Sequence, residues 1–364
     1  MGKQNQNQKS KRVMPFVSVC TPTFNRRPFI QMMFQCFKNQ DYPKSRMEWI
    51  IIDDGTDKIG DLIASANIPQ IKYFPMDQKM ALGEKRNYMH EKAKGSFIVY
   101  MDDDDYYPPE RVSHAIDTLL KNPKALCAGS SELYIYFDHI QKMYQGGPYG
   151  PNHATAGTFA FRKELLETTK YESHAALAEE KAFLKNYTIP FVQLDPMKAI
   201  LVFSHDHNTF DKKRLLENPH PQFFKESTKK VEDFIRHPYE AAIKEFFLHK
   251  MSDALVNYEP GNPRMKPDAI VQMKKIDEER AKISREMQQQ QQKQPIPQIT
   301  MERPGQPPIT LNIEQIVDVL KQQQGQLGQF VARIQELEGM VNSLQMQLVQ
   351  KNEEINKLQK TIVE

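Results

Sequence analysis

The stretch FIVYMDDDDYYPP, residues Phe97–Pro109, decides the fold. Its first five residues are apolar and rich in β-formers, which is typical of a strand buried inside a parallel sheet. Four adjacent carboxylates, Asp102 to Asp105, follow and repel one another unless a cation neutralises them. Mg²⁺ and Mn²⁺ bind carboxylate oxygens, often together with a substrate phosphate. The turn is therefore predicted to bind a divalent metal, and a solvated acidic loop is the alternative.

The segments before this turn alternate between strand and helix patterns. Strands are expected at Phe16–Cys20, Glu48–Ile52 and Ile71–Phe74, and helices at Pro28–Asn39, Leu82–Lys94 (capped by Gly95) and Pro109–Lys121. Such alternation predicts an α/β fold with a doubly wound, parallel sheet. Polar and acidic residues follow three of the strands, at Thr21–Arg26, at Asp53-Asp54-Gly55 and at Asp102. Because ligands bind outside the carboxyl ends of such strands, these residues are expected to share one crevice.

A nucleoside diphosphate carrying a transferable group suits this crevice. Asp53 or Asp54 can accept hydrogen bonds from a base or a ribose, and Arg86 can bind a diphosphate. The alternative for Arg86 is a surface ion pair with Glu84 or Asp77. The chain has neither GxxxxGK[ST] nor GxGxxG after a strand, which argues against NTPases and dinucleotide-binding enzymes.

Composition narrows the class of protein. The 364 residues include 49 basic and 46 acidic side chains, a formal charge of +3, so no nucleic-acid partner is predicted. The 3 cysteines are far apart and suit a reducing compartment. No segment approaches the ~18 apolar residues of a membrane span. We therefore expect a soluble, cytoplasmic protein without an integral membrane segment.

The chain divides into four parts by composition. We expect a disordered basic tail at 1–12, a globular domain at 13–258, a charged helix (Met265–Gln288) with a Gln- and Pro-rich linker at 259–310, and a coiled coil at 311–364. The coiled coil is predicted from a seven-residue repeat. Its a positions are Ile313, Leu320, Leu327, Ile334, Val341, Leu348, Ile355 and Ile362, and its d positions are Ile316, Gln323, Phe330, Leu337, Leu344, Lys351 and Leu358.

This repeat predicts a homo-oligomer. Ile or Val at a with Leu at d, as in 334–358, favours a parallel dimer, whereas Leu320, Leu327 and Phe330 leave a trimer or tetramer open. A lone amphipathic helix packed on the globular domain is the alternative.

Four segments of the globular domain together resemble the family 2 glycosyltransferases. They are FVSVCTPTFNR at Phe16–Arg26, WIIIDDGTD at Trp49–Asp57, LGEKRNYMHEKAKG at Leu82–Gly95 and FIVYMDDDDYYPPERV at Phe97–Val112. The resemblance implies the GT-A fold, a Rossmann-like, mostly parallel mixed sheet, and assigns roles by position. Thr21, Phe24 and Arg26 would line the base pocket, and Asp54 would contact the base, which is usually uracil. Arg86 would contact the base or the diphosphate. Asp102 would contact the ribose and the metal, Asp104 would bind the metal directly, and Asp103 or Asp105 would shape this nucleotide-sugar loop.

The same resemblance places the catalytic base and the last metal ligand. Glu179-Glu180 stands where the family has an acidic pair opening a helix, with Glu180 at the position of the base; a solvated pair is the alternative. In VFSHDHNTF, His205 fits the family's H-x-x-N-T spacing and His207 is the second candidate for the metal. The segments Gly157–Arg162 and Tyr144–Pro151 would be an acceptor-side strand and a mobile lid.

The implied activity is a metal-dependent, inverting hexosyl transfer. Mn²⁺ or Mg²⁺ would stabilise the leaving diphosphate of a UDP-sugar, and the base would activate an acceptor hydroxyl on a glycan, a protein or a small molecule. The alternative is a non-catalytic binding module of GT-A type that is assembled through the coiled coil. A nucleotidyltransferase is a poorer match, because TPTFNRRP lacks the Gly-rich loop expected after the first strand.

Overall fold

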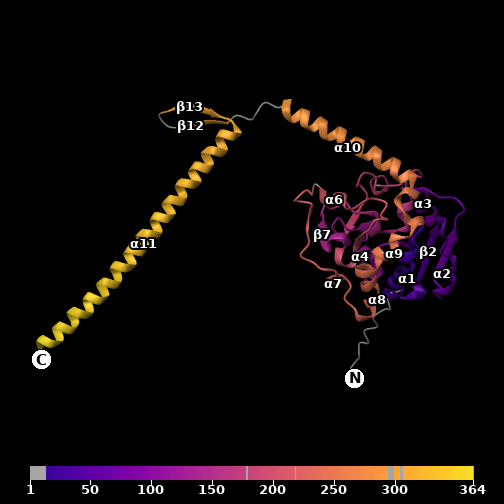
Figure 1. The fold of residues 1–364 in the computed structure, drawn as a ribbon, viewed down its shortest axis with the longest axis horizontal. Coiled ribbons are helices and arrows are strands. Elements are labelled where there is room, and N and C mark those ends of the chain that lie inside the picture. Colours follow the sequence, from indigo (N-terminus) through magenta and orange to yellow (C-terminus); the bar gives the residue numbers. More distant parts are fainter. Residues whose placement is uncertain (1–13, 178, 218, 294–298, 304–305, 364) are drawn as a thin grey trace, which may run out of the picture. The chain divides into compact units, whose positions relative to one another are not determined.

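The computed structural model describes residues 14–177, 179–217, 219–293, 299–303 and 306–363 (Figure 1). Its internal contacts divide the chain into two units, residues 1–278 and 279–364. The basic tail predicted at 1–12 lies outside the described residues. Among the described residues, no helix is both long enough and apolar enough to cross a lipid bilayer.

A seven-stranded mixed sheet forms the centre of the first unit, in the order β3-β2-β1-β4-β8-β5-β9. Its strands are β1 (Val17–Thr23), β2 (Met47–Asp53), β3 (Ile71–Pro75), β4 (Phe97–Tyr100), β5 (Cys127–Gly129), β8 (Ala160–Arg162) and β9 (Phe191–Gln193). β1 runs parallel to β2 and β4, and β2 runs parallel to β3, whereas β8 is antiparallel to β4 and β5. The prediction of an α/β domain with a mostly parallel, mixed sheet is confirmed.

Side chains alternate between the two faces of this sheet, as strand geometry requires. Val19, Trp49 and Val99 join one apolar cluster with α1 (Ile30–Asn39) and α4 (Arg111–Lys121). Cys20, Ile50 and Ile98 join a second cluster with α3 (Leu82–Lys92) and α5 (Glu180–Phe183). Helices therefore cover both faces, and a ligand is expected at the carboxyl edge of the strands.

Two of the differences from the predicted boundaries have structural consequences. β1 continues to Thr23 rather than ending at Cys20, because its pairing with β2 continues to Asp53. α3 ends at Lys92, so Gly95 is not its cap. Instead, a Cβ at Gly95 would lie 2.4 Å from the Ser18 backbone nitrogen, so this glycine allows two backbone segments to pass closely.

A second sheet has the order β10-β6-β7-β11 and packs in the same apolar cluster as α1 and α4. Its strands are β6 (Leu133–Phe137), β7 (Lys142–Gly146), β10 (Val202–Ser204) and β11 (Phe224–Glu226). The remaining helices are α2 (Gly60–Ser65), α6 (Arg214–Glu217), α7 (Val231–Phe234), α8 (Ala241–Glu245), α9 (Met251–Val256) and α10 (Pro267–Lys293). α10 is the charged helix predicted at Met265–Gln288, and it also takes in most of the glutamine run.

The second unit contains a strand pair and one long helix. β12 (Ile299–Arg303) and β13 (Gln306–Leu311) are antiparallel, with the Thr300 and Thr310 hydroxyls 3.3 Å apart. This strand pair lies within the region predicted as a Gln- and Pro-rich linker, where β-branched residues such as Thr300 and Thr310 favour strand pairing. The C-terminal helix α11 (Ile313–Val363) covers the predicted heptads in 51 residues.

Candidate active site

The acidic turn after β4 is held from behind by an aromatic side chain. The Tyr107 hydroxyl accepts a hydrogen bond from the Asp102 backbone N–H at 2.7 Å and lies 3.2 Å from the Gly157 carbonyl oxygen. A Cβ at Gly157 would lie 2.8 Å from an Asp102 carboxylate oxygen, so only glycine fits here without movement. Asp105 accepts from the Phe203 N–H at 3.1 Å, which fixes the far end of the turn. The turn is therefore a positioned structure, not a solvated loop.

Asp104 is the carboxylate that meets cationic and imidazole groups. One of its oxygens lies 3.3 Å from Arg26 Nε and 3.3 Å from His205 Nε2. Burial opposes ionisation of Asp104, but the Arg26 guanidinium and His205 hold its pKa well below the usual range. For Asp103, burial and the neighbouring Asp104 raise the pKa to about 7. The turn thus concentrates its negative charge on Asp104.

Of the two candidate histidines, the structure brings only His205 to the acidic turn. Its Nδ1 accepts from the His207 N–H at 3.2 Å, and its Nε2 faces Asp104 and the Asn208 side chain. Burial lowers the pKa of His205 to about 4, so the ring is neutral near pH 7. The His207 ring instead lies 6.1 Å from the Tyr258 ring, and its backbone carbonyl accepts from Arg26.

These residues fit a divalent cation that arrives together with a nucleotide. In the part of the chain that the structure describes, no three His, Cys, Asp or Glu side chains form a metal-binding cluster. Asp104 and His205 nevertheless make a pair, and Asp102 Oδ1 and Asp103 Oδ2 are buried without a hydrogen-bond partner. Mg²⁺ is usually held by only one or two carboxylates together with substrate phosphates. The donor diphosphate would therefore complete the shell.

A cavity opens at the carboxyl ends of β1, β2 and β4. It is lined by Pro22, Phe24, Arg26, Asp54, Lys79, Met80, Leu82, Lys85, Arg86, Asp102, Asp103, Asp104, Ala176, Leu177, Thr209, Lys266, Asp268 and Ala269. Most of the residues predicted for the nucleotide-sugar therefore meet in one cavity. Five of its lining residues are basic and five acidic, which suits a charged ligand that is bound together with a cation.

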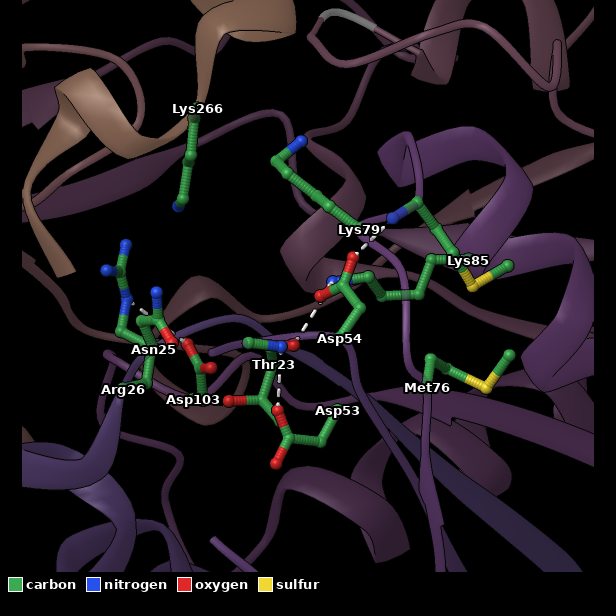
Figure 2. Close-up of polar contacts among 12 residues, drawn as sticks. Thr23, Asn25, Arg26, Asp53, Asp54, Met76, Lys79, Lys85, Asp103 and Lys266 are labelled. Atoms are coloured by element: carbon green, nitrogen blue, oxygen red, sulfur yellow. Dashed lines mark hydrogen bonds and ion pairs between the residues drawn. The ribbon is translucent and has the colours of Figure 1, made fainter. Parts of the chain in front are cut away.

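Asp54, rather than Asp53, faces this cavity (Figure 2). Its carboxylate is hydrogen-bonded to the Lys85 ammonium and accepts from the Met80 N–H at 2.7 Å. The Asp53 carboxylate instead accepts hydrogen bonds within the fold, from the Gly55 and Ile59 N–H groups and from the Tyr73 hydroxyl. The two alternatives left open by the sequence are thus separated by their hydrogen bonds.

Thr21 does not reach the cavity, unlike Phe24 and Arg26. Its hydroxyl donates to the Met101 carbonyl at 2.6 Å and accepts from Trp49 Nε1 at 2.9 Å, and the residue is fully buried. The prediction that Thr21 lines the base pocket is therefore wrong: its hydroxyl links β1 to β2 and to the residue after β4.

Arg86 connects the cavity with the candidate catalytic pair. Its Nε donates to Glu179 at 2.9 Å, and its guanidinium lies 4.5 Å from the centre of the Tyr100 ring. The alternative of a surface pair with Glu84 or Asp77 is therefore wrong, since Arg86 is buried. Burial and the adjacent Glu179 raise the pKa of Glu180, at the start of α5, to about 7. A carboxylate with a pKa near neutrality is suited to general-base chemistry.

A second cavity lies on the other side of the acidic turn. Its lining includes Asp105, Gly157, Ile200, Val202, Phe210, Lys212 and Phe224, and it takes in Gly146 and Tyr149 from the segment predicted as a lid. The two cavities share Asp102, Asp104, Leu177 and Thr209. A ligand in each cavity would therefore meet at the acidic turn.

Three lysines of the first cavity, Lys79, Lys85 and Lys266, are not among the site residues predicted from the sequence. Lys85 precedes Arg86 in a quoted motif, so its position on the same helix could have signalled it. Lys79 lies three residues before that helix, and Lys266 lies far outside every motif. All three ammonium groups lie 5.5 to 5.9 Å from the centre of the Phe24 ring.

An α/β sheet with an acidic turn and a cavity of mixed charge at its carboxyl edge is typical of domains that bind a ligand at that edge. Comparison with known proteins is more specific: residues 18–183 match the family described as glycosyl transferase family 2. The resemblance predicted from the motifs is thus confirmed for this part of the chain.

Curated relatives agree with this assignment. The chain is 31% identical over 102 residues to the putative colanic acid biosynthesis glycosyl transferase WcaA of Escherichia coli, covering 27% of this chain and 36% of that protein. It is 31% identical over 112 residues to the GalNAc(5)-diNAcBac-PP-undecaprenol beta-1,3-glucosyltransferase of Campylobacter jejuni, covering 30% and 34%. The chain thus spans less than half the length of these relatives.

Among solved structures, the chain is similar to the mannosyltransferase PcManGT from Pyrobaculum calidifontis in complex with GDP-Man and Mn²⁺. The TM-score is 0.44 at 14% identity, covering 71% of this chain and 74% of that one.

Proposed function

We propose that this chain transfers a sugar from a nucleotide-diphosphate sugar to an acceptor hydroxyl. The observation that carries the proposal is the meeting of two cavities at Asp102 and Asp104, inside a domain of glycosyl transferase family 2. One cavity would hold the donor and the other the acceptor. A UDP-sugar is the proposed donor, because the resemblance gives Asp54 a contact with uracil, and Asp54 lines the donor cavity. A cytoplasmic location stays a prediction from the sequence.

The donor would bind with its base against Phe24 and Asp54 and its diphosphate towards the acidic turn. Asp104 and His205 would hold Mn²⁺ or Mg²⁺, which when bound stabilises negative charge on the departing diphosphate. Ligation through Nε2 would require the neutral His205 ring to carry its proton on Nδ1, so metal binding would release the hydrogen bond from the His207 N–H. Arg26 would remain nearby to balance the charge of the turn.

Glu180 is the proposed general base. It lies three residues after Leu177, which lines both cavities, and Arg86 fixes the neighbouring Glu179. Glu180 would take the proton of the acceptor hydroxyl while that oxygen bonds to the anomeric carbon. The bond from this carbon to the phosphate oxygen breaks in the same step, and its electron pair leaves with the diphosphate. One displacement inverts the anomeric centre.

Incubation with a panel of UDP- and GDP-sugars and Mn²⁺ tests the proposal. We expect hydrolysis or transfer with one donor, and calorimetry should detect the matching nucleoside diphosphate. Binding without turnover over a wide acceptor panel would favour the non-catalytic module. That alternative is not supported here, because the acidic turn and the Glu179-Glu180 pair are both in place. Absence of any nucleotide binding would contradict the proposal.

We also propose that α11 forms a coiled coil with a second copy of this chain. Its apolar side chains at heptad positions are exposed: Leu320, Leu327, Phe330, Ile334, Leu337, Val341, Leu344 and Leu348 are 46–68% accessible. A solvated stripe of this length is unfavourable, and knobs-into-holes packing against an identical stripe would bury it.

Sedimentation or light scattering of the full chain tests this part. The double variant Leu337→Glu/Leu344→Glu should be monomeric, because two charges would enter the seam. The matched control, Gln335→Glu/Asn342→Glu, places the same charges off the seam and should keep the wild-type mass. A monomeric wild-type chain at micromolar concentration would contradict the coiled coil.

A further inference from the structure

A segment beyond the family match forms one wall of the donor cavity. We call Tyr258–Gln272 the clasp segment; it includes the first turns of α10. Its beginning is fastened to the loop after β1: the Asn25 side chain donates to the Pro260 carbonyl at 2.7 Å, and Arg26 donates to the Gly261 carbonyl at 3.4 Å. A Cβ at Gly261 would lie 2.9 Å from the Asn25 backbone oxygen, so the two backbones are in close contact.

The other end of the clasp segment is fastened to two further parts of the cavity. Asp268 pairs with Lys79 at 2.5 Å. The Gln272 side-chain oxygen accepts from the Ala176 N–H at 2.6 Å and the Leu177 N–H at 3.2 Å. Since Leu177 lies three residues before Glu180, the clasp segment connects the loop after β1 with the segment that precedes α5.

Lys266 is the cation that this segment places in the cavity. Figure 2 shows its side chain extending towards Arg26 and Asp103 from a different part of the chain. Its ammonium donates to the Thr209 hydroxyl at 2.6 Å and lies 5.8 Å from the centre of the Phe24 ring. It therefore stands between the wall expected to hold the base and the turn expected to hold the metal.

The other cations of the cavity already have carboxylate partners. Lys85 is paired with Asp54, Lys79 with Asp268, and Arg26 lies 3.3 Å from Asp104. Within the described residues no ion pair involves Lys266, whose hydrogen bond goes to a neutral hydroxyl. Burial and the nearby Arg26 lower the pKa of Lys266 to about 7. An anion at this place would remove the repulsion between the two cations.

We propose that Lys266 binds the diphosphate of the donor, and that the clasp segment completes the donor site. A diphosphate is the anion that fits, because the chain of a bound nucleotide has to pass from the Phe24 wall to the metal turn. Lysine is a common phosphate ligand, acting as a point charge with rotatable donors. The proposal rests on the proposed function, which supplies the diphosphate.

Calorimetry with UDP and with uridine, both in Mn²⁺, separates this contact from general effects on the pocket. Lys266→Gln keeps the hydrogen-bonding reach but loses the charge, and should raise the Kd for UDP about tenfold while leaving that for uridine within about twofold. Lys266→Arg should restore most of the affinity for UDP. Lys274→Gln, exposed on helix α10 that directly follows Lys266, is the matched control and should bind as the wild type does.

If Lys266→Gln binds UDP as tightly as the wild type does, the proposed contact is overturned while the proposed function stands. The same holds if the variant loses equal affinity for UDP and for uridine. If wild-type protein binds neither UDP nor GDP, the proposed function fails, and this inference with it. If Lys266→Gln does not fold, the contact can be tested on the wild-type protein by acetylating its lysines and measuring the labelling by peptide mass spectrometry. UDP with Mn²⁺ should protect Lys266 at least about tenfold more than Lys274, and equal labelling would overturn the contact.

Discussion

The two walls of the donor cavity are built in different ways. The first comes from the ends of β1, β2 and β4, where Arg26, Asp54 and Asp104 follow their strands within a few residues. The second comes from Thr209 and Lys266, which irregular segments bring from far along the chain. The first wall carries the motifs of the family, and the second lies outside the matched residues 18–183. The first wall is thus built from local strand ends, and the second from packing between distant segments.

The largest effect is expected on the first wall. Asp104→Ala removes the carboxylate that meets both Arg26 and His205, and with it the proposed anchor of the metal. Without the metal to stabilise the transition state, the activation free energy should rise by about 4 kcal/mol, which lowers kcat/KM about a thousandfold. Initial rates at saturating Mn²⁺ measure it. Asp206→Asn, an exposed acidic residue next to His205, is the control and should retain nearly full activity.

The candidate base should give the next largest effect. Glu180→Gln keeps the size of the side chain but cannot accept the hydroxyl proton, so kcat should fall on the order of a hundredfold or more. Donor binding should be unchanged, because Glu180 does not line the donor cavity. Rates and UDP affinities measured on the same preparation check both parts. A wild-type kcat would remove Glu180 from the mechanism.

The pH profile sharpens the same assignment. Because burial and Glu179 raise the pKa of Glu180 to about 7, the active carboxylate form dominates only above that pH. Below it, kcat at saturating donor should fall about tenfold per pH unit, and it should level off above about pH 8, because the bound diphosphate keeps Lys266 protonated. Glu180→Gln should lose this rise. A wild-type profile that is flat between pH 5 and 8 would argue against a base of this kind.

The sequence predicted the first wall well because its signals are local. A strand pattern that ends in Asp54, or in Asp102 and Asp104, fixes both the element and the edge on which the carboxylate lies. Thr21 is the exception: strand pairing continues past Cys20, so this residue is absorbed into the sheet. Whether a polar residue at a strand end faces the ligand or the next strand depends on where pairing stops.

The second wall could not be predicted because packing between distant segments builds it. Lys266 stands in a stretch that reads only as the entry to a charged helix. The contacts that place it, from Asn25 to Pro260 and from Gln272 to Leu177, join residues 235 and 95 positions apart. The choice between His205 and His207 was open for the same reason, and the structure separates them through the ring contact with Asp104.

The smallest effect tests how far the second wall supports the first. Gln272→Ala removes the side chain that holds the backbone of Ala176 and Leu177, without touching the donor. Loss of about 1 kcal/mol of hydrogen bonding should lower kcat/KM about fivefold, mainly through kcat, since the loop leads to Glu180 rather than to the nucleotide. Lys274→Ala, exposed on the same helix, should leave both constants unchanged. If Gln272→Ala instead raised KM alone, the clasp segment would serve donor binding without supporting the candidate base.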